Sequence, residues 1–344
     1  MKPLSLTILP TRKCNLACSY CKIHDQNFPN ELNWKQWISN LKSLNEKIPS
    51  IGFTILLGGD ITTWGDDLPQ FTEAMAEAHL PFAFTTNGVL LDETFLKKLK
   101  ETAIRSVSVS LDTLKTRADN CENLKSQTTM ALLPMMNRLG FKDLHCTVTV
   151  DSTNLEEVPD IIRYLTLQKT YAEITPMLFG KSSSYDYTST YEQLEDRLFT
   201  EWDTDRIEKV MNEVIQMKKE GYLIHNTDWF LLNWSGFGIT QDWYCQYPVG
   251  LVADADGSMR LCLQIKGDRV TKHNIGSLDF DKFLEDWFKD YNECCQGCYW
   301  NCSYESKYIY EKTGSVEAVS KYYAHGVLEV EDLIKRSKVM KGEV

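Results

Sequence analysis

The chain has 344 residues, of which 43% are hydrophobic and 25% are charged, and its formal net charge is −11 at pH 7. This composition is typical of a globular protein with one large domain and a smaller one. The acidic balance, with no dense basic run, argues against a phosphate-binding surface, so we expect neither nucleic acid nor a membrane as a partner. The N-terminal apolar run is broken by Pro10 and lacks a cleavage site, which predicts a cytoplasmic protein.

Strand-like and helix-like segments alternate along the first half of the chain. Six short segments rich in β-branched or aromatic residues predict strands: 4–10, 51–59, 82–88, 106–112, 144–151 and 172–180. Between them, apolar residues recur with a period near 3.6, as in Trp34, Ile38 and Leu41, or follow a helix cap such as Asp92. Pro134 is expected to kink or interrupt one of these helices.

The alternation predicts an α/β fold with parallel strands joined by right-handed crossovers, either a doubly wound sheet or a full or partial (β/α) barrel. In both architectures, ligands bind at the carboxyl ends of the strands.

Polar motifs follow four consecutive predicted strands at that end. They are the thiols Cys14, Cys18 and Cys21, the turn Gly58-Gly59-Asp60, Asn87, and the pair Ser110 and Asp112. Each motif alone is a common turn or helix cap. Four of them in succession at one edge indicate a binding site.

The eleven cysteines point to metal ligation, because a cytosolic protein keeps its thiols reduced. Cys121 and Cys146 stand alone and are expected to be small buried side chains. A structural zinc site takes four protein ligands. The isolated triplet instead suits three irons of a 4Fe-4S cluster, with the fourth iron left open for another molecule.

The segment CNLACSYC resembles the CxxxCxΦC motif of the radical S-adenosylmethionine (radical SAM) superfamily, with Tyr20 as the aromatic residue. The resemblance covers roughly residues 4 to 180 and implies a partial (β/α)6 barrel. In that family, the open iron is chelated by the amino and carboxylate groups of S-adenosyl-L-methionine (SAM).

The same resemblance implies further residues of the SAM site. Gly58, Gly59 and Asp60 match the family's GGE segment, with Asp60 in place of the usual Glu. Ser110 and Asp112 match residues near the ribose and carboxylate, and Asn87 and Asn154 are weaker candidates. The implied chemistry is reductive cleavage of SAM to a 5'-deoxyadenosyl radical that abstracts a substrate hydrogen. It requires a low-potential electron donor such as flavodoxin or ferredoxin.

Residues 181–240 read as a bridge that contains amphipathic helices. A possible capping box runs from Ser189 to Glu192, the residues Ile207, Val210, Met211 and Val214 form one apolar face, and Gly221 ends the helix. Residues 1–180 are then the barrel domain, 241–310 a smaller α+β domain and 311–344 a helical tail.

Residues 245–302 contain a second group of cysteines. Two of them, Cys245 and Cys262, flank a predicted hairpin turn at DADG. With the later cysteines, this region resembles the SPASM/twitch extension of radical SAM enzymes, which implies an auxiliary 4Fe-4S cluster. We expect one such cluster on Cys245, Cys262, Cys295 and Cys298, with Cys294 or Cys302 as substitutes. A structural zinc in the same thiolates is the alternative.

The sequence leaves the reaction open. A fully ligated auxiliary cluster favours a radical SAM oxidoreductase, whose substrate is either a small molecule or, in a maturase, a ribosomal peptide. A non-catalytic iron-sulfur or zinc protein is the remote alternative. Asp228, Tyr187 and His225 lie in bridging segments, but no motif assigns a general acid or base.

Overall fold

The computed structural model describes residues 3, 5–25, 28, 30–48, 51, 53–80, 82–102, 106–179, 189, 191–245, 248–260, 262–263, 273–323 and 330–331. Its centre is one sheet with the strand order β6-β5-β4-β3-β2-β1-β7-β8. All neighbours pair in parallel except the last two. The strands are β1 (Ser5–Ile8), β2 (Thr54–Leu56), β3 (Phe82–Thr86), β4 (Ser106–Ser110), β5 (Asp143–Val150), β6 (Tyr171–Pro176), β7 (Gly250–Ala253) and β8 (Met259–Arg260).

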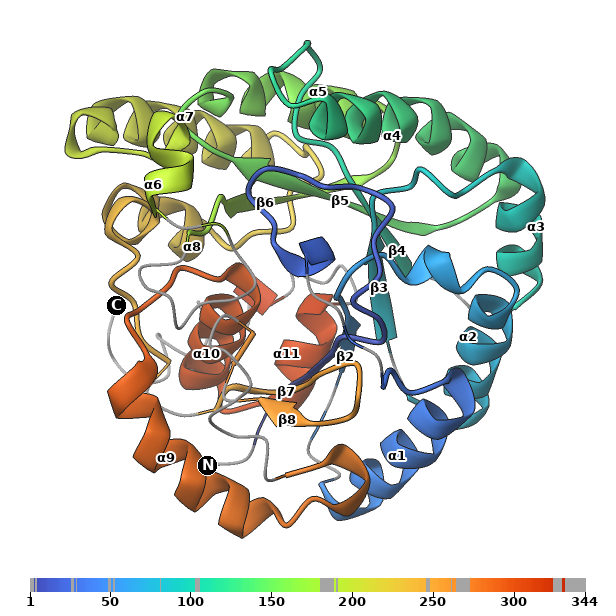
Figure 1. Ribbon diagram of the computed structural model, residues 1–344. Coiled ribbons are helices and arrows are strands. Elements are labelled where there is room, and N and C mark those ends of the chain that lie inside the picture. Colours follow the sequence, from blue (N-terminus) through green and yellow to red (C-terminus); the bar gives the residue numbers. More distant parts are fainter. Residues whose placement is uncertain are drawn as a thin grey trace.

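The first six strands confirm the predicted strand segments and the partial barrel. Helices follow the strands as parallel crossovers require, and Figure 1 shows α1 to α5 and α7 around the outside of the curved sheet. Their bounds are α1 (Trp34–Lys47), α2 (Asp67–Glu77), α3 (Glu93–Glu101), α4 (Asn120–Leu139), α5 (Val158–Leu167) and α7 (Thr204–Lys219). The remaining helices are α6 (Tyr191–Leu194), α8 (Asp228–Leu232), α9 (Phe280–Cys294), α10 (Asn301–Thr313) and α11 (Val316–Tyr323).

Local sequence explains where several helices begin and end. Asp92 caps α3 by accepting a hydrogen bond from the Phe95 amide, as predicted. The apolar face of α7 is buried as expected, and Gly221 follows this helix with a φ of 97°.

One prediction about a helix differs from the structure. Helix α4 continues through Pro134, because the apolar face of the helix is packed against the core on both sides of that residue. The capping box predicted from Ser189 to Glu192 includes residue 190, which lies outside the described residues. The Ser189 hydroxyl donates to the Ser19 carbonyl oxygen at 2.5 Å, so it ties the bridge to the loop after β1.

The hairpin β7–β8 belongs to the barrel sheet, because β7 pairs in parallel with β1. The predicted turn at DADG is confirmed by a hydrogen bond of 2.7 Å from the Gly257 amide to the Asp254 carbonyl oxygen. The Asp254 carboxylate also accepts from the Arg12 Nε at 2.7 Å and from Arg260 at 2.8 Å, all three side chains being buried. This ion pair joins the hairpin to the loop that carries the first three cysteines.

Helices α10 and α11 lie inside the ring formed by the sheet and the outer helices (Figure 1). Ile309 of α10 and Val319 of α11 share a small apolar core with Phe53 and Ile55 of the β2 region. The Phe53 and Tyr323 rings stack at 4.8 Å. These helices therefore close the amino-terminal end of the barrel.

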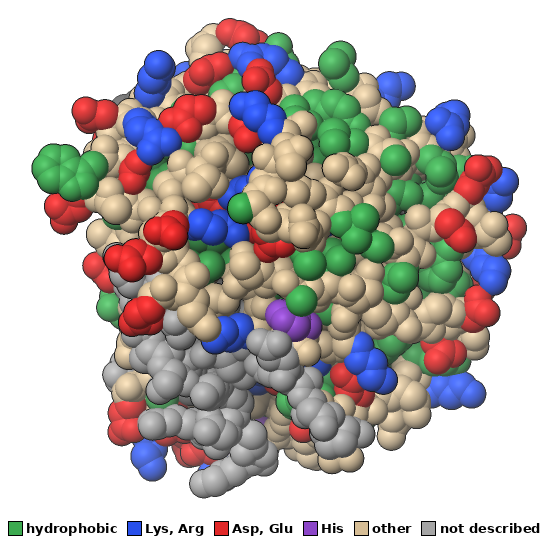
Figure 2. Space-filling view, turned by 45° about the horizontal axis from the view of Figure 1, so that its top comes forward, with side chains coloured by type: hydrophobic (Ala, Val, Ile, Leu, Met, Phe, Trp, Pro, Cys, Tyr) green, Lys and Arg blue, Asp and Glu red, His purple; other side chains and the backbone are tan. Residues whose placement is uncertain are grey.

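Acidic and basic side chains are interspersed over the face shown in Figure 2. In the described part of the chain, each helix is too short or too polar to cross a lipid bilayer.

Candidate functional site

The loop after β1 carries Cys14, Cys18 and Cys21, and all three side chains line one cavity at the carboxyl ends of the strands. The end of β2 holds this loop in place. The Gly59 amide donates to the Thr11 carbonyl oxygen and the Asp60 amide donates to the Lys13 carbonyl oxygen, each at 2.8 Å. The second of these hydrogen bonds holds the residue directly before Cys14. Both bonds therefore fix the position of the cysteine loop relative to the end of β2.

Gly58 and Gly59 are required by this close approach. A Cβ atom on Gly58 would lie 2.4 Å from the Thr11 carbonyl oxygen, and one on Gly59 would lie 2.0 Å from that of Lys13. Gly58 also has a φ of 111°, which disfavours other residues. Both glycines thus let two loops pack backbone to backbone at the site.

Asp60 ties the ends of β2 and β3 together. Its buried carboxylate accepts hydrogen bonds from the amide and hydroxyl of Thr62, the hydroxyl of Thr86 and the amide of Asn87. The Asn87 side chain then donates to Asn15 at 2.8 Å and lies 3.7 Å from the Cys14 sulfur. Asp60 and Asn87 therefore position the cysteine loop from the third strand.

Burial raises the pKa of Cys14 and raises the pKa of Cys18 to about 12. Thiolates form in such surroundings when a metal supplies positive charge. Cys14 and Cys18 converge with Cys21 on one cavity, and three converging thiols fit the irons of a cluster.

Behind the thiols lies a buried ion pair between Asp112, after β4, and Lys125 of α4. Lys125 also donates to the Tyr20 hydroxyl at 2.7 Å, and the Thr149 amide donates to Asp112 at 3.1 Å. Tyr20 and Lys125 line the cavity, as does Ser110. Lys125 was not predicted, because a lone lysine in a helical segment has the sequence pattern of an exposed one.

Asn154 serves the fold at the turn after β5. Its side-chain amide donates to the carbonyl oxygens of Asp112 and Thr149 at 2.8 and 2.9 Å, and its oxygen accepts from the Asp151 amide at 2.8 Å. The residue is 1% exposed. Both polar groups of the side chain are thus used in hydrogen bonds within the turn. Asn154 supports the turn and does not line the cavity.

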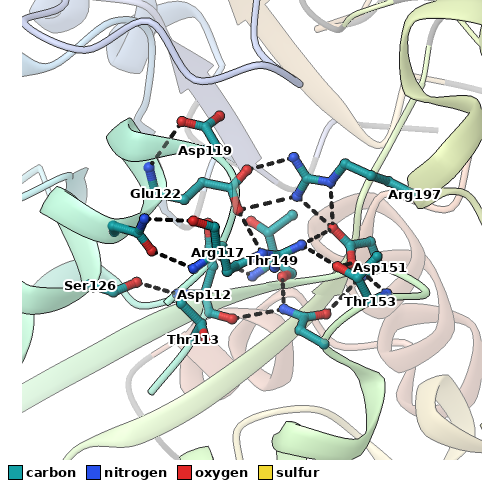
Figure 3. A network of polar contacts seen from close by, with 12 residues as sticks. Asp112, Thr113, Arg117, Asp119, Glu122, Ser126, Thr149, Asp151, Thr153 and Arg197 are labelled. Atoms are coloured by element: carbon teal, nitrogen blue, oxygen red, sulfur yellow. Dashed lines mark hydrogen bonds and ion pairs between the residues drawn. The ribbon is translucent and has the colours of Figure 1, made fainter. Parts of the chain in front are cut away.

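A network of charged residues holds the bridge against this end of the barrel (Figure 3). Arg197 donates to Glu122 of α4 at 2.6 Å and to Asp151 after β5 at 2.8 Å. It also donates to the Ser19 hydroxyl at 2.8 Å, inside the cysteine loop. Arg117 contacts the same two carboxylates, at 3.1 and 2.6 Å, so both acidic groups are shared.

The cavity has a volume of about 260 Å³ and extends down the inside of the barrel. Alternate residues of a strand face one side, so His145, Thr147 and Thr149 of β5 line it one below another, beside Glu173 and Thr175 of β6. Burial raises the pKa of Glu173 to about 7. Polar residues alternating within otherwise apolar strands are the signal that could have found these positions.

A second, smaller cavity of about 70 Å³ is lined by Cys245, Cys262, Cys295, Cys298 and Cys302. The pKa of Cys245 is raised far above its usual value by burial, and further by the neighbouring thiols of Cys298, Cys262 and Cys295. The four thiols expected for an auxiliary site thus converge. Aromatic residues exclude water around them, among them Trp243, Trp287, Tyr291 and Trp300.

The two remaining cysteines of this region differ in position. Cys294 is 3% exposed and packs in the main core. Cys302, at the start of α10, lines both cavities, as does Trp300. In these places, one side chain lines both cavities and is the wall between them.

Sequence comparison identifies the family of part of the chain. Residues 8–165 match the Radical SAM superfamily, a range that contains the last residue of β1, the cysteine loop and the whole of β2 to β5. This part of the chain is a radical SAM domain. The three thiols fit the 4Fe-4S cluster that the family uses together with SAM, and they line the barrel cavity.

Three curated relatives each match less than half of the chain. The Fe-coproporphyrin III synthase of Methanosarcina barkeri is 31% identical over 164 residues, which are 46% of this chain and 40% of that protein. The chain spans 36–40% of the length of the first curated relatives it matches.

Two solved structures share the fold at 18% identity. Streptococcus suis SuiB bound to its precursor peptide SuiA has a TM-score of 0.64 over 84% of this chain and 65% of that one. The structure of anSMEcpe with bound AdoMet and Cp18Cys peptide has a TM-score of 0.57, over 97% of this chain and 99% of that one. At this identity, the likeness is one of fold.

Within the radical SAM domain, the predicted SAM-site residues take two positions. Tyr20, Gly58, Gly59, Asp60, Asn87 and Ser110 line the cavity, whereas Asp112 and Asn154 support it from behind. Of the residues considered as a general acid or base, His225 lines the cavity, Asp228 contacts Lys218 at 3.3 Å and Tyr187 lies outside the described residues.

Proposed function

We propose that the chain is a radical SAM enzyme that abstracts a hydrogen atom from a substrate in the barrel cavity. We further propose that an auxiliary 4Fe-4S cluster, on Cys245, Cys262, Cys295 and Cys298, accepts the electron left on the substrate. The observation that carries both steps is the shared wall of the two cavities, which contains Cys302 and Trp300.

The chemistry supplied by the first cluster and SAM when bound is a one-electron reductive cleavage to methionine and a 5'-deoxyadenosyl radical, which takes a hydrogen atom from the substrate. Loss of one electron and one proton from the substrate then makes the net reaction a two-electron oxidation. A low-potential donor such as flavodoxin or ferredoxin supplies the electron for cleavage.

The residues of the chain control access and position. Helices α10 and α11 close the amino-terminal end of the barrel, which keeps water from a reactive radical. The loop hydrogen bonds at Gly59 and Asp60 fix the thiols relative to the strand ends, and His145 and Glu173 lie deeper in the same cavity. A substrate held by the deeper groups would present its C–H bond toward the thiols.

The substrate we favour is a peptide that inserts one side chain into the cavity. Two solved structures of the same fold contain bound peptides, and the cavity that a peptide side chain would enter has a volume of about 260 Å³. A small-molecule substrate is the second candidate, favoured by the polar side chains of His145, Glu173 and His225 that line the cavity.

Formation of 5'-deoxyadenosine tests the function. Protein reconstituted anaerobically with iron and sulfide should release 5'-deoxyadenosine and methionine from SAM when dithionite is added, and Cys14→Ala should release neither. Cys121→Ala is the matched control, since Cys121 lies on α4 and does not line either cavity among the described residues. Equal product from wild type and Cys14→Ala would contradict the proposal.

A further inference from the structure

Three side chains with metal-ligating atoms meet at the floor of the barrel cavity. His145 comes from β5 and Glu173 from β6. His225 lies beside β6, because its backbone amide donates to the carbonyl oxygen of Ala172 in that strand at 2.8 Å. One ligand atom from each residue lies within 4.8 Å of the other two. All three line the cavity, below the level of the cysteine loop.

From this geometry we propose that His145, Glu173 and His225 bind a divalent transition-metal ion, separate from both iron-sulfur sites. Two imidazoles and one carboxylate are a ligand set that zinc, iron(II) and manganese(II) accept. Three protein ligands leave coordination positions open, and here these face the cavity.

Neighbouring groups form hydrogen bonds and ring contacts with the three residues. In metal sites, such partners fix the orientation of the ligating side chains. The Asn301 amide donates to the Glu173 carboxylate. The His225 Nε2 lies 2.8 Å from the Tyr322 carbonyl oxygen, which can only accept, so Nε2 carries the proton and the lone pair of the neutral ring lies on Nδ1. The His145 and His225 rings meet edge to face, with centroids 4.7 Å apart.

Charge supports a cation at this place. The Glu173 side chain is half-buried in the cavity wall, and among the described residues it accepts a hydrogen bond from Asn301 but forms no ion pair. A carboxylate withdrawn from water is costly unless it is paired or binds a metal. A divalent ion would stabilise the ionised form of Glu173 and accept the two imidazole lone pairs.

The spacing is close to that of a filled site. Donor atoms of a tetrahedral zinc site lie roughly 3.4 Å apart, given bonds of about 2.1 Å. The three ligand atoms here lie within 4.8 Å of one another, so binding would draw any two of them together by at most about 1.4 Å. The open positions would bind an oxygen or nitrogen of the substrate; this use rests on the proposed function, whereas binding of the ion does not.

Titration with Mn²⁺ tests the site in the full-length, reconstituted protein without SAM. Oxidised 4Fe-4S clusters are diamagnetic, so the electron paramagnetic resonance signal of free Mn²⁺ reports binding to nitrogen and oxygen ligands. We expect one Mn²⁺ per chain, displaced by Zn²⁺. Glu173→Gln should weaken binding at least about tenfold, and Asn301→Ala, which removes an orienting group, by about 10- to 100-fold.

Thr175→Val is the matched control, because Thr175 lies on the same face of β6, two residues from Glu173, and lines the same cavity. It should bind Mn²⁺ as the wild type does. His225→Gln gives a second ligand variant should Glu173→Gln fail to fold, as judged by circular dichroism and iron content. Absence of binding in the wild type, or unchanged binding in the ligand variants, would overturn the metal site and leave SAM cleavage untouched.

Discussion

Lys125 shows how a single buried charge organises the SAM side of the cavity. Its ammonium group is held between the Asp112 carboxylate and the Tyr20 hydroxyl, and both charged residues are almost fully buried. Burial lowers the pKa of Lys125, but the attraction of Asp112 together with that of Tyr20 and Cys18 outweighs burial, so the pKa lies well above its usual value. Lys125 therefore remains charged while it supports Tyr20 of the cysteine loop.

Removal of one partner of this pair should be more costly than removal of both. Lys125→Met leaves the Asp112 carboxylate buried and unpaired, and we expect it to lower the free energy of unfolding by about 3–5 kcal/mol. The double variant Lys125→Met, Asp112→Asn should lose less than the sum of the two single variants. Urea unfolding of the four proteins measures this coupling, and strictly additive losses would show that the two side chains do not interact.

At the scale of elements, sequence periodicity was sufficient for the six barrel strands and for helices such as α3 and α7, because their apolar faces pack against one core. It could not show that β7 pairs with β1, since residues 5–8 and 250–253 are far apart along the chain. The packing of α10 and α11 against the β2 region could not be predicted either, because these elements are also far apart along the chain.

The same limit applies to the candidate site. The sequence was sufficient to predict the three-thiol loop and the polar residues at the neighbouring strand ends, because these residues lie in short motifs. Lys125, His145 and Glu173 were missed because each is an isolated polar residue whose partners come from distant elements. The convergence of Cys245 with Cys295 and Cys298 was expected only from the resemblance, and its geometry required the fold.

The bridge depends on Arg197 for its attachment to the barrel. We expect Arg197→Ala to lower the free energy of unfolding by roughly 1–3 kcal/mol, because Arg117 still contacts both Glu122 and Asp151. The larger effect should be local: hydrogen exchange of the backbone amides of residues 191–203 should accelerate, while α7 keeps its protection.

Arg163→Ala is the control for that measurement. Arg163 forms ion pairs with Asp160 and Glu213, but its side chain is 45% exposed, so its removal should cost less than about 1 kcal/mol. Equal exchange rates in residues 191–203 for wild type and Arg197→Ala would show that other contacts hold the bridge.

At the scale of the whole molecule, the chain places two groups of thiols on either side of one wall. Cys14, Cys18 and Cys21 open onto the barrel cavity, and Cys245, Cys262, Cys295 and Cys298 line a second, smaller cavity. The Arg12–Asp254–Arg260 ion pairs join the loop of the first group to the hairpin beside the second. Both groups are thus parts of one folded unit.

Iron content of the reconstituted protein tests this arrangement most directly. The account predicts about eight irons per wild-type chain, and about four in each of two variants. One variant replaces Cys14, Cys18 and Cys21 by Ala, and the other replaces Cys245, Cys262, Cys295 and Cys298. Loss of all iron from the first variant, zinc in place of its iron, or an unchanged iron content in the second variant would contradict the presence of two separate clusters.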